Sequence, residues 1–279
     1  MTIPKNVKNG LLHVLILALG ALMLYPVLWL ISSSFKPTTL IFTDKNLWPS
    51  SFTLEHYKSG WSGLRNIQFG NFFVNSIMLC VIAVFGVVLS SSMAAFAFAR
   101  IDFPLKNLWF ALMLGTIMLP GHVTLIPQYI IFHELNWVDT FLPLTVPKFF
   151  AEAFYVFLIV QFIRGIPKEL DESAKIDGAG WFMLFFRIIL PLCTPALVTA
   201  AIFTFLGTWD DFFGQLIYLS DIKKFTVPLG LRLFLDSSGN SNWGAVFAMS
   251  VLSIVPSLLI FFAGQRYFTQ GIATSGLKG

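Results

Sequence analysis

The stretch NFFVNSIMLCVIAVFGVVLSSSMAAFAFA, residues 71–99, runs for 29 positions without a charged side chain. A helix of about 20 mostly apolar residues crosses the hydrocarbon core of a bilayer, and a helix satisfies its own backbone groups where lipid offers no hydrogen-bond partners. Residues 71–99 are therefore long enough and apolar enough to form a transmembrane helix.

Five further stretches pass the same test of length and composition. The first of them, residues 11–34, is too long to be the apolar region of a cleaved signal peptide, which has about 7–15 residues. Another has Lys148 and Glu152 near its start, and their i,i+4 spacing would let them pair at the membrane interface. The sequence thus predicts an all-α integral membrane protein with six transmembrane helices in a single domain, 1–279. The five stretches are residues 11–34, 108–132, 144–163, 188–219 and 245–264.

The composition of the whole chain agrees with a membrane protein. Of 279 residues, 56% are hydrophobic and only 11% are charged, whereas soluble domains carry about 25% charged residues. A soluble enzyme or binding domain could not cover its surface with so few charges. The net charge of +4 comes from bases scattered between apolar runs, which indicates loops facing lipid headgroups and no nucleic-acid partner.

The Lys and Arg residues near the ends of the spans give a weak indication of orientation. With the N-terminus in the cytoplasm, ten of the 18 bases lie on the cytoplasmic side and eight on the other. Cytoplasmic loops usually carry the excess. We therefore expect both termini in the cytoplasm, the polar segment 36–70 outside, and the loop 164–187 inside.

The loop 164–187 has the pattern of two short helices separated by a break. Pro167 can begin the first helix, and acidic residues follow in the opening turn, where the helix dipole favours negative charge. Gly178 can adopt a positive φ and end that helix, and Asp177 could cap the next turn. Residues 181–186 are apolar but too short for a span, so they should lie flat on a membrane or enter a groove of a partner. An ordinary solvated loop is the alternative.

This loop resembles the cytoplasmic signature of permease subunits in binding-protein-dependent ABC importers. That signature reads E-A-A, three residues, G, nine residues, then I-x-L-P. The spacing here matches at every position, and Ser173 in place of alanine is the sole departure. Serine is small enough to keep close helix packing. The matching residues are Glu172, Ser173, Ala174, Gly178, Ile188, Leu190 and Pro191.

The resemblance extends over the whole chain and favours the carbohydrate-uptake branch of the family. Residues 209–212 are similar to the W-N-D/E-F of that branch, with Asp210 in place of the usual Asn. The ending, 265–279, resembles the second permease subunit of maltose-type importers. Other stretches that resemble the branch are residues 25–29, 33–37, 52–57, 75–76 and 95–100.

The resemblance implies the type I ABC importer permease fold in a bacterial-type cell membrane. It implies a heterodimer with a second, different permease, a pair of cytoplasmic ATPases and an extracytoplasmic sugar-binding protein. The loop helix would be the coupling helix in a cleft of the ATPase, with Glu172 facing basic residues there, and Gln270–Gly279 would run toward the ATPase. The residues expected to couple are Glu172, Ser173, Ala174, Asp177, Gly178, Leu190 and Pro191.

Three residues within the fifth expected span are candidates for the translocation path. Intramembrane carboxylates usually face a cavity or a partner. Asp210 and Asp211 could accept hydrogen bonds from sugar hydroxyls or act at a gate, and Trp209 could stack on a sugar ring. Alternatively, the carboxylates pair with the partner permease or with a base at headgroup level.

A polar loop between the fifth and sixth spans is rich in turn-forming residues. By the resemblance, it lies where such permeases have a loop that reaches into the binding protein and displaces sugar. A plain exposed hairpin is the alternative. The candidate loop residues are Asp236, Ser237, Ser238, Gly239 and Asn240.

Several motifs of other function classes are missing from the sequence. It has no G-x-x-x-x-G-K-[ST] phosphate-binding loop, so ATP and magnesium are expected in the partner ATPase and no cofactor in this chain. Neither G-x-S-x-G nor H-E-x-x-H occurs, which argues against a membrane enzyme. The four His residues show no metal-ligand spacing, and the two Cys residues are expected as small core side chains. The remaining alternative is an ion-coupled secondary transporter or channel acting alone, with Asp210 and Asp211 as its only candidate ion site.

Overall fold

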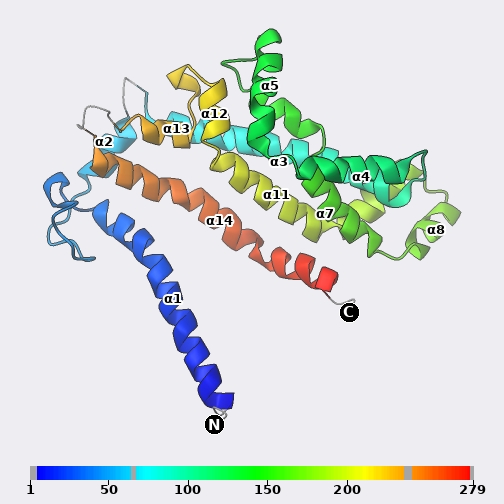
Figure 1. Ribbon diagram of the computed structural model, residues 1–279, viewed down its shortest axis with the longest axis horizontal. Coiled ribbons are helices and arrows are strands. Elements are labelled where there is room, and N and C mark those ends of the chain that lie inside the picture. The colour runs from blue at the N-terminus through cyan, green and yellow to red at the C-terminus, as the bar shows by residue number, and fades with distance from the viewer. Residues whose placement is uncertain (1–4, 64–66, 236–240, 277–279) are drawn as a thin grey trace. The chain divides into compact units, whose positions relative to one another are not determined.

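The computed structural model describes residues 5–63, 67–235 and 241–276, and each regular element in these residues is a helix (Figure 1). The all-α prediction is confirmed. The chain divides into two compact units, residues 1–70 with 231–255 and residues 71–230 with 256–279. The prediction of one domain over 1–279 stays a prediction.

The helices are α1 (Lys5–Ser33), α2 (Glu55–Ser62), α3 (Phe69–Arg100), α4 (Lys106–Ile117), α5 (Gly121–Glu134), α6 (Leu142–Thr145), α7 (Ala153–Arg164), α8 (Glu169–Ile176), α9 (Trp181–Met183), α10 (Leu190–Leu192), α11 (Thr194–Trp209), α12 (Phe213–Tyr218), α13 (Val227–Arg232) and α14 (Trp243–Gly276). Short 3-10 turns cover Thr38–Leu40, Val146–Phe149 and Ile222–Lys224, and a π-helical segment covers Leu184–Ile189.

Four helical stretches among the described residues are long and apolar enough to cross a membrane. They lie at the first, second, fourth and sixth expected spans. A bent pair of helices, Trp181–Leu192 and Thr194–Trp209, adds a fifth at an angle of 76° if the two count as one span. The total of six spans and the cytoplasmic position of both termini stay predictions. The four stretches are Asn9–Ser33, Phe69–Arg100, Leu142–Arg164 and Trp243–Tyr267.

The third expected span, 108–132, is wrong as a single helix. The structure has two helices there, α4 of 12 residues and α5 of 14 residues, separated at Met118–Pro120. Pro120 has no N–H to continue the helical ladder, and its ring disfavours the helical conformation of the residue before it. Hydropathy alone does not register this break, because the residues around it are themselves apolar.

The fifth expected span also differs from its prediction, because the helix does not continue through Asp210 and Asp211. Helix α11 ends at Trp209, and α12 begins at Phe213. The Oδ1 atom of Asp211 accepts a hydrogen bond from the backbone N–H of Gly214 at 2.9 Å. An aspartate that binds a nearby N–H in this way competes with the helical ladder. The two carboxylates are therefore not neighbours on one continuous helix.

In the first unit, Lys36 is a buried residue and not the loop charge that its position between spans predicts. Its side chain has no exposed surface, and its Nζ donates hydrogen bonds of 2.7 Å to the backbone oxygens of Asp44 and Asn46. The backbone oxygen of Lys36 lies 2.8 Å from Nε2 of His56. Lys36 thus links the start of segment 36–70 to residues 44–46 through its ammonium group and to α2 through its backbone oxygen.

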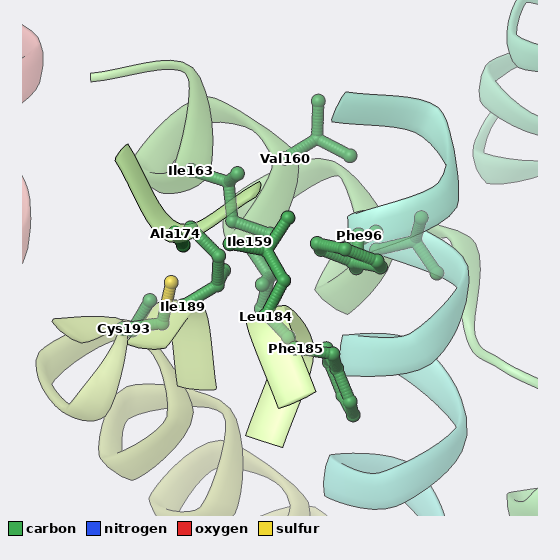
Figure 2. Close-up of a cluster of buried hydrophobic side chains, with 12 residues drawn as sticks. Phe96, Ile159, Val160, Ile163, Ala174, Leu184, Phe185, Ile189 and Cys193 are labelled. Carbon is green, nitrogen blue, oxygen red and sulfur yellow. The ribbon is translucent and has the colours of Figure 1, made fainter. Parts of the chain in front are cut away.

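The second unit has a hydrophobic cluster built on α3, α7, α8 and the π-helical segment. Figure 2 shows Phe96 of α3 and Ile159 of α7 beside Leu184 and Phe185, with Ala174 of α8 at the same core. The small side chain of Ala174 lets α8 approach the longer helices closely. This cluster holds one face of α8 against the unit.

Candidate functional site

Helix α8 forms where the sequence predicts it, and its charges agree with the helix dipole. It begins at Glu169, two positions after Pro167, and has Glu169, Asp171 and Glu172 in its first turn and Lys175 in its last. Acidic side chains near the N-terminus and a basic one near the C-terminus each stabilise a helix. The eight residues of α8 are therefore consistent with a stable short helix.

The end of α8 at Gly178 confirms the predicted break. Gly178 has a φ of +82°. Its N–H donates to the oxygen of Lys175 at 3.0 Å, and the N–H of Ala179 donates to the oxygen of Ala174 at 2.9 Å. These two bonds are the Schellman arrangement that ends a helix. The prediction that Asp177 caps the next turn is wrong, because Asp177 ends α8 itself and Gly180 precedes α9.

A buried ion pair fastens α8 to the end of α3. The Arg100 Nε lies 2.7 Å from Oδ2 of Asp171, and the two side chains are only 3% and 10% exposed. An Nη atom of Arg100 also donates a 2.7 Å hydrogen bond to the backbone oxygen of Ile166, just before α8. The Arg100 guanidinium therefore holds both α8 and the segment that leads into it.

Sequence reasoning missed the role of this pair. Asp171 lies three residues before the buried Ala174, so both occupy the same face of α8. That spacing was the available signal that Asp171 points inward. Its partner, Arg100, is 71 positions earlier in the chain, and no local pattern connects the two.

The predicted coupling residues divide between the two faces of α8 and the segment after it. Glu172, Ser173, Asp177 and Gly178 are exposed, and so is Pro191 in α10. Ala174 is buried, and Leu190 is half-buried against the hydrophobic cluster. The Oγ of Ser173 donates to the oxygen of Glu169 at 2.9 Å, so the Ser173 hydroxyl is bonded within its own helix.

The exposed side of this region is apolar as well as acidic. Ile176 is 86% exposed and Phe182 is 79% exposed, and both stand close in sequence to Glu172. Across the break, the Lys175 ammonium lies 4.6 Å from the ring centroid of Trp181, a cation–π contact. α8 and α9 thus present one surface that carries the Glu172 carboxylate and the apolar side chains of Ile176 and Phe182. We name it the α8–α9 surface.

Residues 181–186 are not the isolated interfacial helix that their length predicts. They run from α9 into the π-helical segment, where Leu184 and Phe185 are buried in the hydrophobic cluster. The bent pair of helices at the fifth expected span therefore begins with α9, which is itself part of the α8–α9 surface. A displacement of α8 would be transmitted to this pair through the chain itself.

The candidate path residues lie at the end of α11. Trp209 is 2% exposed, and its ring stacks on Phe205 with centroids 5.8 Å apart and packs against Phe73 at 5.7 Å. In this conformation the Trp209 ring offers no open face to a sugar. Asp210 is exposed, whereas Asp211 is half-buried and engaged with Gly214. The assignment of these residues to a path stays a prediction.

The candidate binding-protein loop, Asp236–Asn240, lies outside the described residues, and its role stays a prediction. The chain on either side of it is described. The N–H of Asn242 donates to the oxygen of Phe234 at 3.0 Å, and Oδ1 of Asn242 accepts from the N–H of Ala245 at the start of α14. The first bond holds the two flanks of the loop together, and the second caps the start of α14.

Neither the His nor the Cys residues form a metal site in the described part of the chain. No group of three or more His, Cys, Asp or Glu side chains there could hold a metal ion. Cys80 and Cys193 are free and buried, as expected for small core side chains. His56 is buried against the backbone oxygen of Lys36.

Comparisons with known proteins agree with the resemblance noted in the sequence. The chain is 36% identical over 265 residues to the arabinooligosaccharides transport system permease protein AraQ of Halalkalibacterium halodurans, covering 91% of each chain. It is 32% identical to the trehalose/maltose transport system permease protein MalG of Thermococcus litoralis, covering 98% of this chain and 99% of that one.

A solved structure shares the fold. A chain of a bacterial ABC transporter involved in the import of the acidic polysaccharide alginate matches with a TM-score of 0.83 at 19% identity, covering 96% of this chain and 99% of that one. Residues 86–274 match the protein family described as binding-protein-dependent transport system inner membrane component. That range contains α8, the Arg100–Asp171 pair and the whole loop signature. The chain therefore belongs to the family of binding-protein-dependent transport system inner membrane components.

Proposed function

We propose that this chain is the permease subunit of an ATP-driven ABC importer that translocates a sugar delivered by an extracytoplasmic binding protein. Relatives over nearly the whole chain are named as permeases for arabinooligosaccharides and for trehalose and maltose. An oligosaccharide or related carbohydrate is the cargo class that these names favour. The chain itself is a transport subunit and not an enzyme.

The single observation that carries the proposal is the α8–α9 surface. α8 is fixed by a buried ion pair on one face and presents Glu172 and Ile176 on the other. A carboxylate beside apolar groups suits a cleft with a base in it, because partial burial strengthens a charge-assisted contact. We propose that this cleft belongs to a cytoplasmic ATPase, two copies of which hydrolyse ATP with magnesium on behalf of the complex.

The other partners follow from the same mechanism. A second, different permease completes the path in a heterodimer, and the binding protein docks on the opposite side of the membrane. ATP-driven closure of the ATPase pair would displace α8, and α9 and the bent pair after it would transmit the displacement to the fifth span. In this proposal the chain holds no cofactor of its own.

An ion-coupled transporter acting alone receives less support from the geometry. It would need a titrating carboxylate directed at an ion path. Asp211 is engaged with the N–H of Gly214, and Asp210 ends α11. A docking surface fixed as firmly as α8 would also have no purpose in a protein that works alone.

Reconstitution in liposomes tests the proposal. We expect sugar uptake only when this chain is combined with the second permease, the ATPase and the binding protein, and ATP hydrolysis that rises when the binding protein carries its sugar. Glu172→Ala should weaken ATPase binding, and Glu169→Ala on the same helix serves as the matched control. Sugar uptake by this chain alone, or normal coupling in Glu172→Ala, would contradict the proposal.

A further inference from the structure

A basic pocket lies beside the α8–α9 surface, where several helices of the second unit end. Its volume is about 660 Å³. Four of its lining residues are basic and one, Asp102, is acidic. The basic residues are Arg100, Lys106, Arg164 and Lys168.

Two of these four cations are available to a ligand. Arg100 is occupied by Asp171, and the Lys106 Nζ donates to the oxygen of Ile101 at 2.8 Å. Arg164 and Lys168 are both exposed, and no acidic side chain lies within ion-pair distance of either in the described parts of the chain. Arg164 is positioned by its stacking over the Phe110 ring, at 5.2 Å from the centroid. The pocket therefore has two cations without an acidic partner among the described residues, and the contact with Phe110 holds one of them, Arg164, in place.

The backbone adds to this charge. Lys106, Asn107 and Leu108 line the pocket and form the first turn of α4, a helix of 12 residues. The N–H of Lys106 donates to the oxygen of Phe103 at 3.3 Å, whereas those of Asn107 and Leu108 have no partner within the helix, and the helix N-terminus carries a partial positive charge. An anionic group such as a phosphate would meet both the side-chain cations and this helix end.

The position of the pocket points to the membrane surface. The candidate spans Phe69–Arg100 and Leu142–Arg164 both end at residues that line it. Leu105, which lines the pocket, is 65% exposed, and Trp109, one helical turn further along α4, is 55% exposed. Leu105 is held there with a φ of +58°, a conformation that is costly for a residue other than glycine and that clusters at functional sites.

We infer that this pocket binds the phosphate of an anionic phospholipid, with the acyl chains lying along the exposed apolar side chains of α4. Basic pockets at the ends of transmembrane helices have the charge that such headgroups require, and tryptophan is typical of the headgroup level. A soluble phosphate would use the cations but would gain nothing from Leu105 and Trp109. The lipid would sit beside Arg100, the residue that fixes α8, and so would tie the docking element to the bilayer.

The test compares lipid binding of the purified full chain with that of two charge-matched variants. Native mass spectrometry after extraction from equal mixtures of phosphatidylglycerol and phosphatidylcholine measures the lipid retained. Arg164→Gln with Lys168→Gln removes the two free cations of the pocket. Lys58→Gln with Lys223→Gln removes two exposed cations elsewhere and is the control.

We expect the wild type to retain phosphatidylglycerol in preference to phosphatidylcholine. Each pocket cation should raise the affinity for phosphatidylglycerol about fivefold, so the pocket double variant should bind this lipid about 25-fold more weakly. The affinity of the control double variant should stay within about twofold of the wild type. Lys168→Gln alone, at a position that makes no side-chain cap, should lose about fivefold and guards against misfolding of the double variant.

Three results would overturn the inference. The first is equal retention of phosphatidylglycerol by the wild type and the pocket double variant. The second is displacement of the lipid by inorganic phosphate at equal concentration, which would make the pocket a site for soluble phosphate. The third is no lipid retention by the wild type together with loss of ATPase binding in the double variant, which would make the pocket a protein contact. None of these results depends on sugar transport, so they are separate from the test of the proposed function.

Discussion

Removing the carboxylate of Asp171 should release α8 from the second unit while leaving the α8–α9 surface chemically unchanged. In Asp171→Ala, the guanidinium of Arg100 keeps only its hydrogen bond to the oxygen of Ile166. Asp171 faces away from the exposed carboxylate of Glu172. The substitution therefore tests the attachment of the helix and not its docking chemistry.

The expected cost follows from the burial of the pair. Leaving one charge of a buried ion pair without its partner costs about 3–5 kcal/mol. We expect the lower end, about 3 kcal/mol, for two reasons. The Nε and Oδ2 atoms are 2.7 Å apart without forming an aligned hydrogen bond, and Oδ1 of Asp171 has no partner in the described residues. The pocket that Arg100 lines also brings open space close to the uncovered ion pair.

Amide hydrogen exchange measures this release directly. The N–H groups of Asp177, Gly178 and Ala179 are bonded to oxygens of α8, and they lose these bonds when the detached helix, too short to be stable alone, unfolds. A loss of about 3 kcal/mol corresponds to exchange that is about 100-fold faster. Coupled ATP hydrolysis and sugar uptake should fall as well, because an unfolded α8 cannot pass a displacement on through α9 to the bent pair.

Two variants separate the ion pair from other causes. Glu172→Ala, one residue away on the exposed face, should weaken ATPase binding without changing the exchange of these amides. Arg100→Met with Asp171→Leu replaces the pair by apolar groups and should restore slow exchange, since such replacements are often neutral or stabilising. Unchanged exchange in Asp171→Ala would refute the role assigned to the pair.

Three further predictions concern other parts of the chain. Gly178→Val should destabilise the end of α8 by about 1–2 kcal/mol and uncouple transport, because the φ of +82° at this position is unfavourable for any side chain even where nothing crowds it. Gly180→Ala, at a φ of −75°, is the control and should behave as wild type. Equal amide exchange rates in the two variants would contradict this prediction. Hydrogen bonds, that from Lys224 first among them, lower the pKa of the Asp139 carboxyl to about 2. The stabilising contribution of the Asp139 carboxylate should therefore be complete above about pH 4, its pKa in the unfolded chain, and be lost as the pH falls through about 2. Asp139→Asn should flatten this part of a plot of Tm against pH, and an unaltered plot would exclude this contribution. Deleting 236–240 should keep the permease folded and the binding protein docked but reduce sugar uptake while ATP hydrolysis continues, and uptake at the wild-type rate would favour the plain hairpin.

Hydropathy predicted the positions of the spans because composition over about 20 residues decides whether a helix is stable in lipid. It failed where the backbone breaks inside an apolar region. Pro120 removes a hydrogen-bond donor, and Asp211 takes the N–H of Gly214, and neither event changes the average hydropathy of its surroundings. The local pattern of acids and Gly178 predicted α8 because capping is a matter of a few consecutive residues.

Contacts between distant residues were beyond the reach of the sequence. Arg100 and Asp171 each read as an ordinary charge at the edge of a loop, and their burial depends on the packing of Ala174 against α3 and α7. Trp209 was predicted as a sugar-stacking surface from its position beside two carboxylates. Its burial against Phe205 depends on the ring four residues earlier on the same helix, which the motif does not include.

The buried Lys36 closes the turn over residues 36–46 with a cation that belongs to the chain. Many extracellular modules close a loop by placing backbone carbonyls around a calcium ion, and such loops open when a chelator removes the metal. Here an ammonium group supplied by the chain itself gathers the carbonyls of Asp44 and Asn46. We therefore expect this turn, which should face the extracytoplasmic medium, to keep its conformation at high calcium, at low calcium and in the presence of EDTA.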